Sequence, residues 1–283
     1  FAGCSENAGN GTSGSSAEAA GFDTANEITV ISRENGSGTR GAFIELTGVE
    51  EKNDAGEKID NTTADAEIAN KTDVVLTSVA GNEKAIGYIS LGALNDTVKA
   101  VKVDGAEATV DNVKAGAYKL SRPFNIATKG EPTGVAKDFI SFILSKEGQA
   151  VVTDNKYIAV NDEAESFVSD GSSGQIAVGG SSSVSPVMEK LIEAYKSVNP
   201  NASIDLQTSD STSGMTGAMD GTFAIGMASR ELKDEEAAQL TGTAIALDGI
   251  AVIVNPANTI DELSMDQIKS IYVGDITDWG DLA

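Results

Sequence analysis

Short apolar stretches alternate with amphipathic stretches along the chain from about residue 27 onward. The apolar stretches are rich in Val and Ile, which favour strands, and the segments between them repeat apolar residues at helical spacing. Strands are predicted over residues 27–33, 85–91, 98–103, 123–129, 175–178, 203–207, 223–227 and 243–254. This alternation predicts an α/β fold.

Several predicted helices follow these strands. Their apolar faces are formed by Ala42, Phe43 and Leu46, by Val135, Phe139, Ile140 and Ile143, and by Met188, Leu191, Ile192 and Tyr195. Ser185 is the expected N-cap of the third helix, with Pro186 at its first position. Residues 264–267 (SMDQ) fit a capping box for a helix that ends near residue 272. With 283 residues, of which 40% are hydrophobic, the chain is long enough for two lobes.

Composition excludes several classes of function. The chain has 43 acidic and 20 basic residues, a net charge of −23, which argues against binding to nucleic acid or anionic membrane surfaces. It contains no histidine and one cysteine, so no cofactor, metal site or His-assisted nucleophile is expected. An enzyme using carboxylates is an alternative, but the acidic run 234–236 is interpreted as the solvated first turn of a helix. No apolar run reaches the roughly 20 residues that span a bilayer.

Residues 1–21 are interpreted as a tether that carries an anchor. Residues 5–21 are dominated by Ser, Gly, Ala, Asn and Glu, a composition typical of a flexible segment. Cys4 follows the small residues Ala2 and Gly3, which resembles a bacterial lipobox. The resemblance implies lipidation of Cys4 and a location on the extracellular face of the cell membrane; an incidental free cysteine is the alternative.

Three predicted turns share one design, in which a strand ends, small hydroxyl or glycine residues follow, and a helix begins. They cover residues 36–39 (GSGT), 180–183 (GSSS) and 209–214 (SDSTSG). Helix N-termini present unpaired N–H groups and partial positive charge, and hydroxyls add donors there. Each turn is therefore a candidate anion cradle, although Ser and Thr at helix starts are also ordinary N-caps.

Basic residues near these turns are further candidates. Arg33 ends the strand that leads into the first turn, and a guanidinium can donate two hydrogen bonds to a tetrahedral oxyanion. A surface position among the many carboxylates is the alternative for Arg33. Arg230 follows the strand at 223–227 and is a second candidate. Arg40 lies within a predicted helix and is expected to be solvated or paired.

The chain resembles the phosphate-binding proteins of bacterial phosphate ABC importers over nearly all of residues 22–283. The motifs that carry the resemblance are ISRENGSGTRGAF (31–43), AIGYISLG (85–92), RPFNIATKGEP (122–132), IAVGGSSSVSPVMEKL (176–191), QTSDSTSGMTGA (207–218), IGMASREL (225–232) and DGIAVIVNP (248–256). The family implies a two-lobed, periplasmic-binding-protein-like (type II) fold with the anion between lobes that close by a hinge. It implies that one lobe donates to phosphate through Arg33, Ser37, Gly38 and Thr39, and the other through Ser182, Ser183 and Ser211.

The resemblance implies high-affinity binding of inorganic phosphate and its delivery to an ABC-type import permease. A binding protein for another oxyanion, such as sulfate or molybdate, is the alternative within this class. A surface sensor or adhesion protein that reuses the fold is an alternative from another class, because fold does not fix function.

Two departures from the family pattern qualify the resemblance. Some members have an aspartate that accepts the proton of phosphate, where this chain has Ser229; Asp210 or Asp248 could replace it. The order of the two halves is also reversed, as in a circular permutation.

The reversed order implies a division of the chain into lobes. One lobe combines residues 22–121 with 257–283, the other covers 122–256, and 161–174 is the linker between the usual termini. A monomer is expected; a dimer in which 257–283 completes a neighbouring lobe, and a longer tandem protein, are the alternatives.

Overall fold

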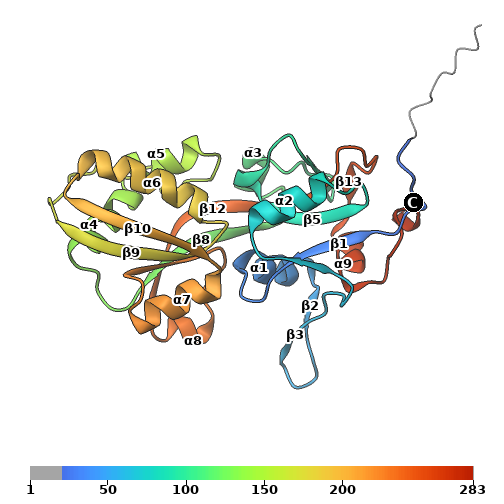
Figure 1. The fold of residues 1–283 in the computed structure, drawn as a ribbon, viewed down its shortest axis with the longest axis horizontal. Coiled ribbons are helices and arrows are strands. Elements are labelled where there is room, and N and C mark those ends of the chain that lie inside the picture. The colour runs from blue at the N-terminus through green and yellow to red at the C-terminus, as the bar shows by residue number, and fades with distance from the viewer. Residues whose placement is uncertain (1–20, 283) are drawn as a thin grey trace, which may run out of the picture.

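The computed structural model describes residues 21–282, and its elements form the predicted mixed α/β, two-lobed architecture. One sheet has nine strands in the order β10-β9-β11-β8-β12-β5-β1-β4, with β6 beside β12. In Figure 1 this sheet extends from one lobe into the other. The strands are β1 (Thr29–Arg33), β4 (Glu67–Ala69), β5 (Ala85–Ser90), β6 (Lys99–Ala100), β8 (Ser121–Thr128), β9 (Gly174–Ser181), β10 (Ala202–Ser209), β11 (Ile225–Ala228) and β12 (Thr241–Val254).

The first lobe is built on β1, β5 and the end of β12. Its core includes Ile31, Val252 and a group of aromatic rings in which Phe43 stacks on Tyr88 with centroids 3.9 Å apart. Helices and short strands cover this core: α1 (Gly38–Thr47), α2 (Thr72–Ala80), α3 (Val110–Lys114), α9 (Met265–Val273), β7 (Lys102–Val103) and β13 (Glu262–Leu263). A hairpin formed by β2 (Glu50–Lys52) and β3 (Lys58–Asp60) projects from the lobe (Figure 1).

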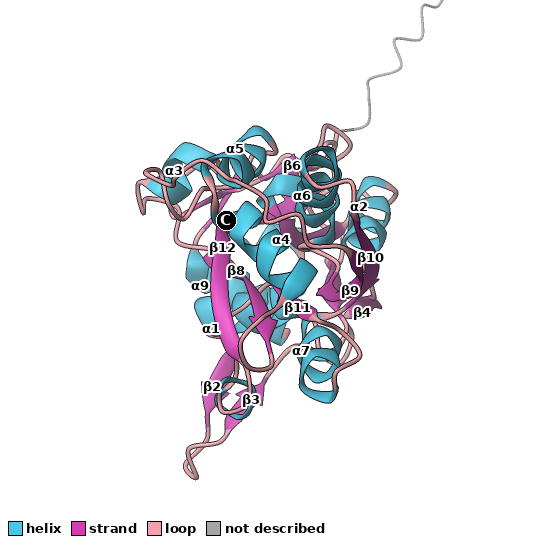
Figure 2. Ribbon diagram, turned by 90° about the vertical axis from the view of Figure 1, so that its left-hand side faces the viewer, coloured by secondary structure: helices cyan, strands magenta, loops and turns pink. Residues whose placement is uncertain are grey.

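The second lobe is built on β8 to β11. Ile126 of β8 lies in a large core with α4 (Gly134–Leu144), α5 (Lys146–Asp154) and α6 (Ser185–Val198). The next residue, Ala127, lies in a smaller cluster under α7 (Ser211–Asp220). Successive side chains of a strand point to opposite faces, so helices cover both faces of this part of the sheet. Figure 2 shows these helices on the two sides of the strands.

Strand β12 belongs to both lobes. It pairs with β8 from Thr241 to Gly249 and with β5 from Ile250 to Val254. Ala246 packs in the core of the second lobe and Ile250 in that of the first. The passage from one hydrophobic core to the other therefore occurs within β12, between Ala246 and Ile250, because this buried strand extends without interruption through both lobes. The sequence prediction put the lobe boundary at residue 256, after the end of this strand.

A buried ion pair joins β8 and β12 where they cross between the lobes. Arg122 and Asp248 are direct cross-strand partners, with Nη2 and Oδ2 3.2 Å apart and side chains 2% and 1% exposed. The backbone N–H of Gly92 donates to Asp248 Oδ1 over 3.3 Å. The guanidinium also lies over the ring of Phe124, 5.3 Å from its centroid. These contacts place Asp248 where β8 and β12 pass between the lobes.

The segment 161–174 packs against the second lobe through Asp138. Burial by itself raises the pKa of this carboxyl, but it accepts hydrogen bonds from Asp170 N, Tyr195 Oη, Ser169 Oγ and Asn199 Nδ2, and together these lower the pKa. Bonds to the charged form therefore outweigh desolvation. They fix the path of the segment along the surface.

The strand predicted over residues 98–103 is two short strands instead. β6 pairs with β12 in the large sheet, whereas β7 pairs with β13 in a separate small sheet. The chain leaves the large sheet at Val101, whose N–H still donates to Val252 O over 2.9 Å. The alternation of apolar residues over 98–103 predicts a strand but not the strands it pairs with, so it could not reveal that the pairing partner changes.

The C-terminal segment completes the first lobe within the same chain. Ile268, Tyr272 and Trp279 are buried in its core. Trp279 N donates to Asn26 O over 3.2 Å, so the two ends of the described chain lie side by side. Cys4 falls outside the described residues. Within residues 21–282 no helix has both the length and the apolar character needed to cross a membrane.

Candidate functional site

The first of the predicted turns joins β1 to α1 and positions Arg33. Ser37 caps α1 by accepting a hydrogen bond from Arg40 N over 3.2 Å. Gly36 has a φ of 91°, a left-handed conformation that favours glycine. Arg33 is 2% exposed although it lies at the end of a strand, so its guanidinium points inward between the lobes.

Side chains of the first lobe support the backbone of Arg33. Tyr88 Oη accepts from Arg33 N over 3.2 Å and lies 2.9 Å from Ser32 Oγ; burial raises the pKa of Tyr88 to about 12. Arg40 Nη1 donates to Arg33 O over 2.6 Å, and its Nε to Asp60 Oδ2 over 3.0 Å. Arg40 is therefore paired, one of the two states expected from its sequence position.

The second turn lies in the other lobe, between β9 and α6. Ser181, Ser182 and Ser183 are at most 8% exposed, and Ser183 N donates to Ser181 Oγ over 3.2 Å. The predicted cap of α6 was wrong by one residue. Val184 holds the N-cap position, and Ser185 is already helical, with its Oγ 2.7 Å from Thr208 Oγ1.

The third turn places Ser211 at the start of α7, beside Ser229 at the end of β11. Ser229 N donates to Ser211 Oγ over 3.0 Å, and Ser181 Oγ donates to Ser229 Oγ over 2.9 Å. The two side chains are 0% and 1% exposed. Both turns of the second lobe thus meet at Ser229.

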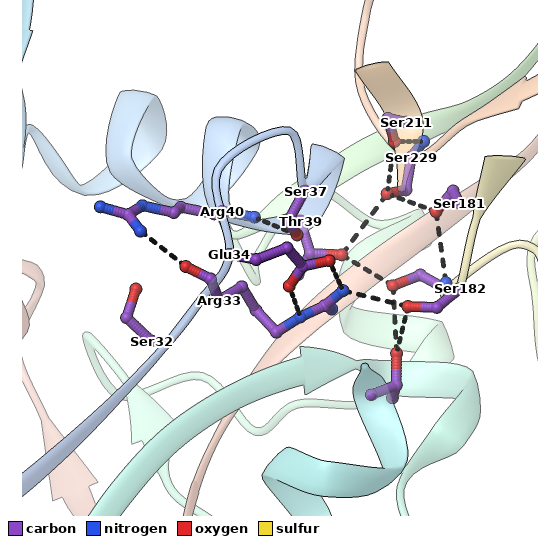
Figure 3. A network of polar contacts seen from close by, with 12 residues as sticks. Ser32, Arg33, Glu34, Ser37, Thr39, Arg40, Ser181, Ser182, Ser211 and Ser229 are labelled. Carbon is purple, nitrogen blue, oxygen red and sulfur yellow. Dashed lines mark hydrogen bonds and ion pairs between the residues drawn. The ribbon is translucent and has the colours of Figure 1, made fainter. Parts of the chain in front are cut away.

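Hydrogen bonds connect the two lobes across this cluster (Figure 3). Arg33 Nη2 donates to Ser182 Oγ over 3.0 Å. Thr39 Oγ1 lies 2.7 Å from Ser183 Oγ and 3.4 Å from Ser229 Oγ. Seven residues named in the sequence analysis therefore lie at this junction: Arg33, Gly38, Thr39, Ser182, Ser183, Ser211 and Ser229. Ser37 is next to Gly38 in the chain and bonds within its own lobe, as the cap of α1.

Thr72 is a member of the cluster that the sequence analysis missed. It starts α2, is 5% exposed, and places Oγ1 3.4 Å from both Ser182 Oγ and Ser183 Oγ. The apolar spacing of Val75, Leu76 and Val79 could have revealed this helix. Its hydroxyl start then follows the same rule as the three recognised turns.

Four helices, α1, α2, α6 and α7, therefore begin at or next to the cluster. Their unpaired N–H groups and dipoles make the junction locally positive in a strongly acidic chain. Arg33 adds a full charge, balanced by Glu34, whose Oε2 lies 2.8 Å from Arg33 Nε. In the described part of the chain no group of three or more His, Cys, Asp or Glu residues is placed to hold a metal ion. The arrangement of hydroxyls, helix starts and a guanidinium suits hydrogen-bond donation to an anion.

Arg230 and Asp210, two further candidates, are engaged elsewhere. Arg230 donates to both oxygens of Glu236 over 2.8 and 2.7 Å. Burial raises the pKa of Glu236, but the bonds from Arg230 and from Lys233 N lower it overall. Glu236 is 3% exposed, so the expectation that the run 234–236 is solvated was wrong for this residue. Asp210 caps α7, accepting from Ser213 N over 2.8 Å.

Known proteins match most of this chain. The model of the PBP superfamily domain matches residues 16–147 and 166–283. The phosphate-binding protein PstS 2 of Streptococcus agalactiae serotype V is 53% identical over 258 residues, covering 90% of this chain and 88% of its own. PstS of Bacillus subtilis is 33% identical over 138 residues, 48% of this chain and 43% of its own.

One solved structure superposes over most of the molecule. The phosphate-binding protein of a phosphate ABC transporter from Streptococcus pneumoniae has a TM-score of 0.74 and 50% identity, over 91% of this chain and all of that chain. The overall fold is thus shared with this phosphate-binding protein. The chain belongs to the PBP superfamily and, within it, to the PstS family of phosphate-binding proteins.

Proposed function

We propose that this protein binds inorganic phosphate between its lobes and delivers it to an ABC-type import permease. One observation carries the proposal: buried donors from both lobes converge at the starts of four helices, beside the buried Arg33. Donors from opposite sides suit a tetrahedral oxyanion, whose oxygens point in four directions. The S. agalactiae relative and the S. pneumoniae structure are both named as phosphate-binding proteins.

Each lobe supplies part of the proposed ligand shell. Arg33, Ser37, Gly38 and Thr39 donate from the first lobe, and Ser182, Ser183, Ser211 and Ser229 from the second. An anion bound here needs both lobes in contact, so binding favours the closed arrangement. Strands β8 and β12 connect the lobes and form the hinge. The permease then recognises the closed form.

Isothermal titration calorimetry of the 283-residue chain with phosphate, sulfate and molybdate tests this function. We expect tight one-to-one phosphate binding, with light scattering giving the mass of a monomer. A preference for sulfate or molybdate would reassign the ligand within the oxyanions. Failure of all three anions to bind would overturn the proposal and leave a sensor or adhesion role for the fold.

Gly38→Ala should weaken phosphate binding through a clash between the lobes. A Cβ at Gly38 would clash with Ser211 Oγ and lie 2.7 Å from Ser229 Oγ. Overpacking of this kind costs about 1–3 kcal/mol. Here it would destabilise the closed arrangement of the lobes, because Gly38 belongs to the first lobe and both serines to the second. Gly41→Ala in the same helix is the control, because its Cβ would lie 3.5 Å from Arg230 Cδ. Equal phosphate affinities of the two variants in calorimetry would contradict this account.

The proposed location is the extracellular face of the cell membrane, with lipid on Cys4 as the anchor. The support is the lipobox-like sequence around Cys4 and the polar tether up to residue 21. Radiolabelled palmitate should be incorporated into the protein in bacterial cells and lost in Cys4→Ser. Equal labelling of both forms would exclude this anchor.

We also propose that the two halves stand in circularly permuted order. In support, the family model matches two separate segments, and residues 26 and 279 are hydrogen-bonded neighbours. The B. subtilis relative matches about half the chain, as reversal of the halves would produce. A variant cut within 161–174, with residues 283 and 22 joined by a short linker, should fold and bind phosphate. A variant that does neither would count against the permuted order.

A further inference from the structure

To select phosphate over sulfate, a site needs a group that responds to whether the bound anion carries a proton. Near neutral pH phosphate still carries a proton, whereas sulfate has none. Arginine and backbone N–H groups donate to both anions, and serine and threonine hydroxyls can rotate to serve either. An ionised carboxylate only accepts, so it bonds a protonated oxygen and repels a bare one. This inference rests on the proposed binding of phosphate at the junction of the lobes.

Glu34 is the carboxylate that the structure places against the donor cluster. Arg33 Nε donates to Glu34 Oε2 over 2.8 Å, and Arg33 Nη2 donates to Oε1 over 2.9 Å. The same Nη2 donates to Ser182 Oγ of the other lobe over 3.0 Å. Figure 3 shows the Glu34 side chain folded back over the guanidinium toward the interlobe hydroxyls.

The position of Glu34 is fixed by its surroundings. It follows Arg33 directly, and its backbone N–H donates to Ala69 O of the neighbouring strand over 3.2 Å. Its side chain is 19% exposed, against 2% for Arg33. Each carboxylate oxygen has two acceptor sites, so acceptor capacity remains after the two bonds from Arg33.

The other candidate carboxylates are bound in different contacts. Asp248 pairs with Arg122 in the hinge over 3.2 Å, and Glu236 binds Arg230. Asp210 accepts from the backbone and the hydroxyl of Ser213 over 2.8 and 2.9 Å, within its own helix turn. Of these four carboxylates, Glu34 is the one that accepts hydrogen bonds from a member of the donor cluster, Arg33.

We propose that Glu34 determines the selectivity of the site by accepting the proton of bound phosphate. Its negative charge also cancels that of Arg33, which leaves the helix N-termini as the net attraction for the anion. A fully deprotonated tetrahedral dianion meets an acceptor in that place and is rejected. From the sequence, Asp210 and Asp248 were the candidates for this role, and Glu34 was not among them.

The test compares Glu34→Gln with Asp210→Asn by calorimetry with phosphate and with sulfate at neutral pH. Both variants remove one negative charge beside the cleft with little change in shape. In Glu34→Gln we expect phosphate affinity to fall about 10- to 100-fold, the scale of one charged hydrogen bond. Sulfate affinity should rise, because the new amide can donate. Asp210→Asn should leave the ratio of the two affinities unchanged, since asparagine also caps a helix.

Parallel changes in both affinities would overturn the proposal, because they would mean that Glu34 only balances the charge of Arg33. A change of ratio in Asp210→Asn in place of Glu34→Gln would also overturn it. Glu34→Asp, which keeps a carboxylate, should retain more of the preference than Glu34→Gln and so exclude a folding defect as the cause. Phosphate binding by the unmodified chain is measured first, so failure of the function is separated from failure of this role.

Discussion

Arg33→Ala is expected to weaken phosphate binding by about 2–5 kcal/mol, the scale for removing one partner of a buried, charged contact. This corresponds to a loss of about 30-fold to several thousand-fold in affinity. Arg33 is 2% exposed and bonds Ser182 across the lobes, so its removal takes away both an anion donor and an interlobe contact. It also leaves Glu34 without its partner beside the anion.

Calorimetry with phosphate measures this loss directly. Arg33→Lys should recover part of the affinity, because it restores the charge without the planar, two-pronged donor. Lys190→Ala is a matched control: it also removes one positive charge, but from an exposed position on α6, where Lys190 pairs with Glu193 at 3.1 Å. If Arg33→Ala bound phosphate as tightly as Lys190→Ala does, Arg33 would lie outside the site.

Asp248→Ala is expected to lower the free energy of unfolding by about 3–5 kcal/mol, because it leaves a buried guanidinium unpaired. Arg122 and Asp248 are 2% and 1% exposed and hold β8 to β12 between the lobes. Removing one partner of the ion pair destabilises the fold, but the intact pair need not stabilise it more than two well-packed apolar side chains would. The double variant Arg122→Met with Asp248→Leu should therefore unfold at a higher urea concentration than Asp248→Ala.

Urea unfolding followed by circular dichroism distinguishes these cases. Glu193→Ala supplies the comparison, since its ion pair with Lys190 is exposed and such pairs contribute about 0–1 kcal/mol. A similar small loss for Asp248→Ala would show that water reaches Arg122 in the hinge. A double variant less stable than Asp248→Ala would show that the charges themselves stabilise the crossing of β8 and β12.

Local patterns in the sequence were sufficient to identify the fold class and the three turns with hydroxyl residues. The reason is that strand alternation and helix capping depend on residues close to one another in the chain. The capping box at Ser264 and Gln267 formed as predicted, and α9 begins there. Hydroxyls at helix starts belong to the same local class, which is why Ser37 and Ser211 could be named as candidate anion donors from the sequence.

Contacts between residues far apart in the chain could not be predicted from the sequence. The sequence left Arg230 as a candidate donor, and Asp210 and Asp248 as candidate acceptors, with nothing to include or exclude them. Their partners Ser213, Glu236 and Arg122 distinguish them, and the last of these lies 126 positions away in the chain. Spacing along the chain does not determine which cation a buried carboxylate meets.

The sequence by itself determined which residues could donate to an anion, because helix capping and strand ends are local properties of the chain. The tertiary structure decided that side chains of both lobes, among them Arg33 and Ser229, meet at one junction. It also decided that Thr72 lies in the same cluster and that Glu34 lies against Arg33. The physical reason is that these contacts depend on how two lobes close around the paired strands β8 and β12. That closure is a property of the whole sheet.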